Sequence, residues 1–101
     1  MEESNVLTQK IRYEDAIYEG EVFDGLPHGK GIKKWINGKT YKGDFVMGKI
    51  EGKGVIIHHD GSTYTGDCKD DRANGLGVFK WSEGSTYDGE WKDDKRNGKG
   101  Y

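Results

Sequence analysis

The feature that most constrains this chain is an internal repeat with a period of 23 residues. A tyrosine recurs four times at this spacing, followed each time by a glycine two residues later and then by an acidic residue. The tyrosines are Tyr18, Tyr41, Tyr64 and Tyr87, and the glycines are Gly20, Gly43, Gly66 and Gly89. Because self-similarity at a fixed period of about 20 to 50 residues is typical of repeat architectures, the sequence predicts a stack of similar units.

Each unit is predicted to form a β-hairpin. In the first unit one strand covers residues 18–23, a turn covers residues 24–28 and a second strand covers residues 29–35. The next turn contains Asn37-Gly38, and such dipeptides tolerate the positive φ of tight turns. Glycine at both ends and in the middle of each unit would break a helix repeatedly. We therefore expect an all-β fold, a single-layer twisted antiparallel sheet made of tandem β-hairpins.

The sequence leaves open which face of this sheet is the more buried. Only 32% of the residues are apolar, and 17 of the 101 are glycine. Alternation along the first strand places Tyr18, Gly20 and Val22 on one face. We expect the aromatic rings on that face to lie flat against glycine backbone and to supply most of the apolar area. The opposite face carries a second apolar column, Ile32, Val55 and Val78.

The repeat also predicts the organisation of the chain. Residues 1–17 fall outside the regular pattern but contain a strand-like stretch at residues 6–13, so we expect an N-terminal cap that pairs with the first edge of the sheet. The repeat array then covers residues 18–101, divided into 18–40, 41–63, 64–86 and 87–101.

Charge and terminal composition exclude several classes of function. The net charge of −2 and the pI near 5.9 give no basic field for nucleic acid. The N-terminus is acidic and carries no apolar segment of the kind found in secretory signals. The single cysteine, Cys68, has no partner for an internal disulfide, which is typical of a reducing compartment. We expect a cytoplasmic protein.

No catalytic, cofactor or metal site is expected. The segment Gly38-Lys39-Thr40 looks like the end of a phosphate-binding loop, but Lys33 occupies the position that needs the first glycine. His58 and His59 are adjacent, so on a strand they point to opposite faces and cannot readily share one metal ion. Cys68 has no histidine partner in phase and is expected to fill space. We therefore expect a protein that is not an enzyme and holds no cofactor.

The recurring pattern Tyr-x-Gly-Asp/Glu, then Gly-x-Gly, then a turn glycine resembles the MORN repeat (membrane occupation and recognition nexus). In the first unit these motifs are Tyr18-Glu19-Gly20-Glu21 and His28-Gly29-Lys30-Gly31. The resemblance implies a non-catalytic scaffold or adaptor that contacts proteins or assembles with itself, associated with the cytoskeleton, a cilium or a membrane. The alternative that it implies is a phospholipid-recruiting module of a larger protein, similar to plant phosphatidylinositol-phosphate kinases.

Three candidate surfaces follow from these expectations. The first is an aromatic column that is either core or an exposed groove suited to a partner helix or extended peptide: Lys33, Trp35, Ile56, His58, Phe79 and Trp81. The second is a C-terminal edge with Trp91 and Tyr101, suited to a second copy of the chain and hence to a homo-oligomer. The third belongs to the lipid alternative, in which Lys30, Lys33 and Lys34 contact an anionic phospholipid.

Overall fold

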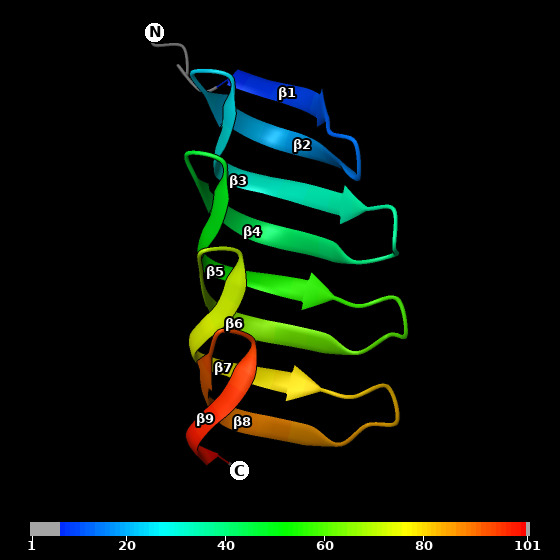
Figure 1. Ribbon diagram of the computed structural model, residues 1–101, viewed down its shortest axis with the longest axis vertical. Coiled ribbons are helices and arrows are strands. Elements are labelled where there is room, and N and C mark those ends of the chain that lie inside the picture. Colours follow the sequence, from blue (N-terminus) through cyan, green and yellow to red (C-terminus); the bar gives the residue numbers. More distant parts are fainter. Residues whose placement is uncertain (1–6, 101) are drawn as a thin grey trace, which may run out of the picture.

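The computed structural model describes residues 7–100, with side chains from residue 8 to residue 96. This described part forms one sheet of nine antiparallel strands that lie side by side in chain order (Figure 1). The strands are β1 (Leu7–Arg12), β2 (Ala16–Phe23), β3 (Leu26–Trp35), β4 (Thr40–Val46), β5 (Lys49–Ile57), β6 (Thr63–Lys69), β7 (Arg72–Lys80), β8 (Thr86–Lys92) and β9 (Lys95–Gly100). Its secondary structure is strand and turn without helix, so the expected all-β sheet of tandem hairpins is confirmed.

The first strand lies outside the repeats and pairs with them. β1 runs antiparallel to β2, with Ile11 opposite Tyr18. Each repeat then contributes one hairpin, β2–β3, β4–β5, β6–β7 and β8–β9, and neighbouring hairpins pair through the strands that follow each other in sequence.

The expected turn at residues 24–28 is wrong, because the hairpin closes over two residues and β3 already begins at Leu26. Asp24 and Gly25 have φ values of 54° and 78°. Positive φ at both central residues is the requirement of a type I′ turn, whose twist matches that of the flanking strands. The composition of the segment indicated a turn, but it did not show how tight the turn is.

A line of glycines crosses the sheet and marks a bend. Neighbouring strands place glycine opposite glycine from β2 to β9, at Gly20, Gly31, Gly43, Gly54, Gly66, Gly77, Gly89 and Gly100. Just beyond this line the pairing shifts. The step of two positions from Gly20 to Val22 on β2 lies opposite a step of four positions, from Gly31 to Pro27, on β3. The same irregularity recurs in every hairpin. The longer path on one strand makes a bulge, which bends a sheet.

The bend gives the ribbon a curved cross-section. Figure 1 shows the strand ends at the tight turns curving over one side of the sheet, while the longer turns between repeats project at the opposite end. The molecule measures 47 × 28 × 23 Å. A flat sheet of one layer is only about 10 Å thick, so most of the 23 Å dimension comes from the curvature.

The tyrosine face is the buried one, which answers the question that the sequence left open. Tyr18, Tyr41 and Tyr64 are almost fully buried, whereas Ile32 and Val78 on the opposite face are 36% and 37% exposed. Each tyrosine ring lies against the glycine line, where a Cβ atom added to Gly31 would lie 2.3 Å from the Cε1 atom of Tyr18. The small residue is therefore required by the close approach of the ring.

In the second and fourth repeats, an aromatic residue two positions after the glycine of the Tyr-x-Gly motif packs between successive tyrosines. The ring of Phe45 makes edge-to-face contacts with Tyr18 and Tyr41 at centroid distances of 4.9 and 5.2 Å. The ring of Trp91 makes the same kind of contact with Tyr64 and Tyr87. Aromatic side chains thus provide much of the core in both halves of the ribbon, and the buried Cys68 holds the equivalent position in the third repeat.

Candidate interaction groove

The structure places all six residues of the predicted aromatic column on the tyrosine face. Ile56 is buried, with 3% of its surface exposed. The other five are half-buried: Lys33, Trp35, His58, Phe79 and Trp81. The column therefore belongs partly to the core and partly to the surface, so neither of the two readings of it applies alone.

A cavity of about 420 Å³ opens at the centre of this column. Ile56, His58 and Phe79 line it from the column, and Tyr64 and Trp91 line it from the core. The remaining lining residues come from the turns between repeats and from the curved-over strand ends: Lys39, His59, Asp60, Ser62, Ala73 and Asp94. The cavity thus lies between the two sides of the bent sheet, and we call it the central cavity.

The central cavity lies beside a small residue. Ala73 occupies the position, immediately after the first residue of the second strand, that Pro27 and Ile50 occupy in the first two hairpins. The side chain of Ile50 is buried at its equivalent position, with 1% of its surface exposed. Because alanine is several methyl groups smaller, the third hairpin leaves space where the second is filled.

Sequence reasoning missed the cavity residues that come from outside the column. Ala73 and Asp94 lie close to the turns of the third and fourth hairpins, and the bend brings them toward the column. The signal available in the sequence was the departure of Ala73 from the larger residues of its column. That signal identifies a gap only once the bend is known.

Trp91 lies in the core and not at an edge of the sheet. β8 pairs with β7 on one side and with β9 on the other. The indole of Trp91 is 7% exposed, and its N–H donates a hydrogen bond to the carbonyl oxygen of Gly77 at 3.1 Å. It therefore lines the central cavity instead of forming part of an assembly edge. The second residue predicted for that edge, Tyr101, lies outside the described residues.

The three lysines of the lipid alternative are divided between the two faces. The ammonium group of Lys33 lies on the tyrosine face, 4.7 Å from the ring centroid of Tyr13 and 5.1 Å from that of Trp35. Lys30 and Lys34 are exposed on the opposite face, and Lys30 forms an ion pair with Asp44. The geometry does not bring the three charges together.

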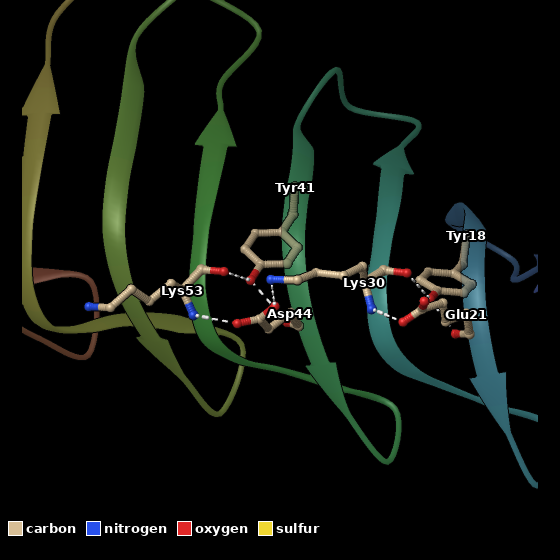
Figure 2. A network of polar contacts seen from close by, with 6 residues as sticks. All are labelled: Tyr18, Glu21, Lys30, Tyr41, Asp44 and Lys53. Atoms are coloured by element: carbon tan, nitrogen blue, oxygen red, sulfur yellow. Dashed lines mark hydrogen bonds and ion pairs between the residues drawn. The ribbon is translucent and has the colours of Figure 1, made fainter. Parts of the chain in front are cut away.

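The acidic residue of each of the first three repeats has a structural role next to the bulge. Figure 2 shows the network in the first two repeats, made by Tyr18, Glu21, Lys30, Tyr41, Asp44 and Lys53. A carboxylate oxygen of Glu21 accepts a hydrogen bond from the backbone N–H of Lys30 at 2.7 Å, and Asp44 accepts one from the N–H of Lys53 at 3.1 Å. These carboxylates satisfy backbone donors where the ladder of the sheet is interrupted.

The same carboxylates connect neighbouring repeats. Asp44 is paired with the Lys30 ammonium group of the previous hairpin, and Asp67 with that of Lys53. Ion pairs therefore join neighbouring hairpins across the ribbon at these two positions. The hydrogen bond from Lys30 holds the pKa of Asp44 below its usual value, against the opposing effect of partial burial.

Two candidate reactive groups, the half-buried His58 and the buried Cys68, have shifted pKa values. Burial lowers the pKa of His58, and the nearby charge of Lys39 lowers it further. Burial raises the pKa of Cys68 to about 11, with additional contributions from nearby carboxylates. The thiolate is the nucleophilic form of cysteine, so the neutral thiol of Cys68 is a poor nucleophile near pH 7.

Among the side chains of residues 8–96, no cluster of three or more histidine, cysteine or carboxylate groups is able to hold a metal ion. Within the same range, no helix has the length and apolar character needed to cross a membrane.

Comparison with known proteins places the chain in a family. The MORN repeat family model matches four consecutive segments, at residues 18–40, 41–63, 64–86 and 87–101. A comparison with curated proteins finds no match. The four matches cover residues 18–101 without a gap and coincide with the four hairpins, so the chain is a repeat scaffold that belongs to the MORN repeat family.

Proposed function

We propose that this protein is a non-catalytic scaffold that binds a helix or an extended segment of a partner protein in the groove between the two sides of its bent sheet. MORN repeats are generally non-catalytic and are commonly interaction repeats for proteins or membranes. The observation that carries the proposal is the central cavity of about 420 Å³ within a column of half-buried aromatic side chains. Concave sites with apolar walls and a few polar groups are the usual form of binding sites.

The groove has the features of a recognition surface and not only those of a core. Phe79, Trp81 and Trp91 form a connected aromatic group, with Phe79 at centroid distances of 4.7 Å from Trp81 and 5.7 Å from Trp91. Tryptophan and tyrosine are enriched among the residues that dominate binding energy at interfaces. A partner segment that enters the groove covers these rings and removes them from water.

A cavity-filling variant tests this proposal. Ala73→Ile introduces at the third hairpin the residue that the second hairpin carries at Ile50, so the variant is expected to stay folded. Proteins captured from a cell extract by the native chain should be lost when Ala73→Ile or Trp81→Ala is used. Leu76→Ser is the control, because Leu76 is 63% exposed on the opposite face. Specific capture that persists in a folded Ala73→Ile variant would contradict the proposal.

The phospholipid alternative has less support from the geometry. Its three lysines lie on two faces, and Lys30 is paired with Asp44. Attraction to an anionic surface is worth about 1 kcal/mol for each lysine near the surface that is not already paired. Sedimentation with phosphatidylserine vesicles at low salt measures it directly. A fraction bound that falls when Lys33 and Lys34 are replaced by glutamine would favour the membrane over the protein partner.

A further inference from the structure

We propose that the central cavity takes a positively charged side chain, an arginine or a lysine, of the partner segment. This inference rests on the proposed function and deepens it, because it names the chemistry of the residue that anchors the partner. The argument depends on the aromatic walls of the cavity, on its carboxylates and on the cations that the chain already places over its other aromatic rings.

The walls of the cavity are suited to a cation. Tyr64, Phe79 and Trp91 surround it, and the ring of Trp91 lies 5.4 Å from that of Tyr64 and 5.7 Å from that of Phe79, measured between centroids. The face of an aromatic ring carries partial negative charge and attracts ammonium or guanidinium groups within about 6 Å. The methylene groups of a lysine or arginine pack against the same rings.

The charged groups of the cavity favour a cation over a neutral side chain. Asp60 and Asp94 both line the cavity. Lys39 lines it too, with its ammonium group 5.0 Å from the ring centroid of Trp35, so the two carboxylates outnumber this single positive charge. Burial lowers the pKa of His58, so its imidazole adds no positive charge near pH 7. An apolar anchor would take water away from the two carboxylates without replacing it, which costs free energy.

The chain itself shows this pairing on both sides of the cavity. Lys33 and Lys39 lie over Trp35, and the guanidinium group of Arg96 lies 6.0 Å from the ring centroid of Trp81. Among the side chains of residues 8–96, by contrast, no lysine or arginine lies over Phe79 or Trp91. Phe79 and Trp91, the two rings of this aromatic group that line the cavity, therefore have no cation over them from the described side chains.

Titration with small probes tests the inference without any partner protein. The probes are N-acetyl-arginine amide, N-acetyl-lysine amide and N-acetyl-citrulline amide, the last of which has the shape of arginine without its charge. We expect the two cationic probes to shift the amide NMR signals of Ala73 and Phe79 and the indole signal of Trp91. The citrulline probe should bind about tenfold more weakly. The ratio between arginine and lysine then shows which cation the cavity prefers.

Two isosteric variants locate the site. Asp94→Asn and Asp60→Asn keep an oxygen that can accept the hydrogen bonds now donated by the backbone N–H groups of Ala73 and Ser62, so the turns are retained. Each should weaken the arginine probe by about fivefold, because a charged interaction is lost. Asp71→Asn is the matched control, since Asp71 accepts the equivalent hydrogen bond from Ile50 but does not line the cavity.

Three outcomes would overturn the inference: equal binding of citrulline and arginine, absence of shifts with both cationic probes up to their solubility limits, or equal weakening by Asp71→Asn and Asp94→Asn. Its failure is distinguishable from failure of the proposed function. If partner capture depends on Ala73 while no cationic probe binds, the groove is a binding site and only the cation is wrong.

Discussion

The carboxylate of Asp71 accepts a hydrogen bond from the backbone N–H of Ile50, 2.8 Å away in the preceding hairpin. In return, the N–H of Asp71 donates to the carbonyl oxygen of Ile50 at 3.1 Å. Asp94 and Ala73 repeat both bonds one hairpin later, at 2.6 and 3.0 Å. The tight turns of the third and fourth hairpins are thus each attached to the hairpin before them by one backbone donor and one side-chain acceptor.

The first pair of hairpins differs from this arrangement in both partners at once. Pro27 stands where Ile50 stands and has no N–H, and Gly48 stands where Asp71 stands and has no carboxylate. Only the backbone bond remains, from the N–H of Gly48 to the carbonyl oxygen of Pro27 at 2.8 Å. The backbone N–H donor and the carboxylate acceptor are therefore present together or absent together. As a result, none of these interfaces leaves the N–H group without its carboxylate partner.

Asp71→Gly should destabilise the chain more than Asp71→Asn. Glycine adopts the φ of 68° found here but removes the acceptor, which leaves the buried N–H of Ile50 unsatisfied. We expect a loss of about 1–3 kcal/mol in the free energy of unfolding. Asparagine keeps both the φ and an acceptor oxygen and should cost much less. Urea denaturation of the three proteins measures both values, and equal stability of the two variants would contradict the role of the hydrogen bond.

Gly54→Ala should disrupt the core by steric overlap. An added Cβ would lie 2.4 Å from the Cε1 atom of Tyr41, and the backbone φ of Gly54 is not in the left-handed region. Overpacking of a filled core costs about 1–3 kcal/mol, and the rigid ring makes the upper end of that range the expectation. The control is Gly84→Ala, which has a φ of 108° but open space around it. A larger loss in thermal stability for Gly84→Ala than for Gly54→Ala would be inconsistent with this packing.

The repeat made the sheet predictable, because hairpin turns and alternating strands leave a direct periodic signal. It did not reveal the bend. Glycines such as Gly20 and Gly31 could be read as space for aromatic rings, and acids such as Glu21 as one charged face. Their second role is to form the bulge, where the register shifts and the carboxylate accepts a hydrogen bond from an unpaired backbone N–H. This role depends on how two strands pair. No single strand contains that information.

The candidate site was predictable only in part for the same reason. The aromatic column follows from strand alternation, and the structure places all six of its residues on one face. The central cavity needs the opposite side of the bent sheet, which contributes Ala73 and Asp94. The sequence predicts an edge position for Trp91, but β9 pairs with β8 and encloses it.

Met47→Asn should stabilise the chain. Met47 has a φ of 45° in the turn between β4 and β5, and it is the one residue at a tight-turn position in the described chain that is neither aspartate nor glycine. Asparagine tolerates this region at lower cost, so a gain of about 0.5–1 kcal/mol is expected. Val46→Asn, an equally exposed neighbour within β4, is the control and should not stabilise. Calorimetry measures the melting temperatures of both variants. A melting temperature of Met47→Asn that is no higher than that of the native chain would contradict the prediction.

The chain should lose stability in alkali through its buried tyrosines. Burial raises the pKa of Tyr18 from its ordinary value near 10 to about 12, and it raises the pKa values of Tyr41 and Tyr64 as well. The neutral hydroxyl of Tyr18 donates to the carbonyl oxygen of Glu21 at 2.5 Å, and that of Tyr64 donates to Asp67 at 2.6 Å. A raised folded pKa contributes stability that is fully present below the unfolded pKa and is lost as the pH rises through the folded one.

Unfolding in urea at a series of pH values measures this effect. The free energy of unfolding should be constant up to about pH 9 and should then fall progressively between about pH 10 and pH 12. Tyr18→Phe removes one of the coupled groups, so its stability should be lower at neutral pH but should fall less steeply above pH 10. Titration of all six tyrosines with a midpoint near pH 10 and an unchanged circular dichroism spectrum would contradict this prediction, because it would show that the buried hydroxyls ionise in the folded chain like exposed ones.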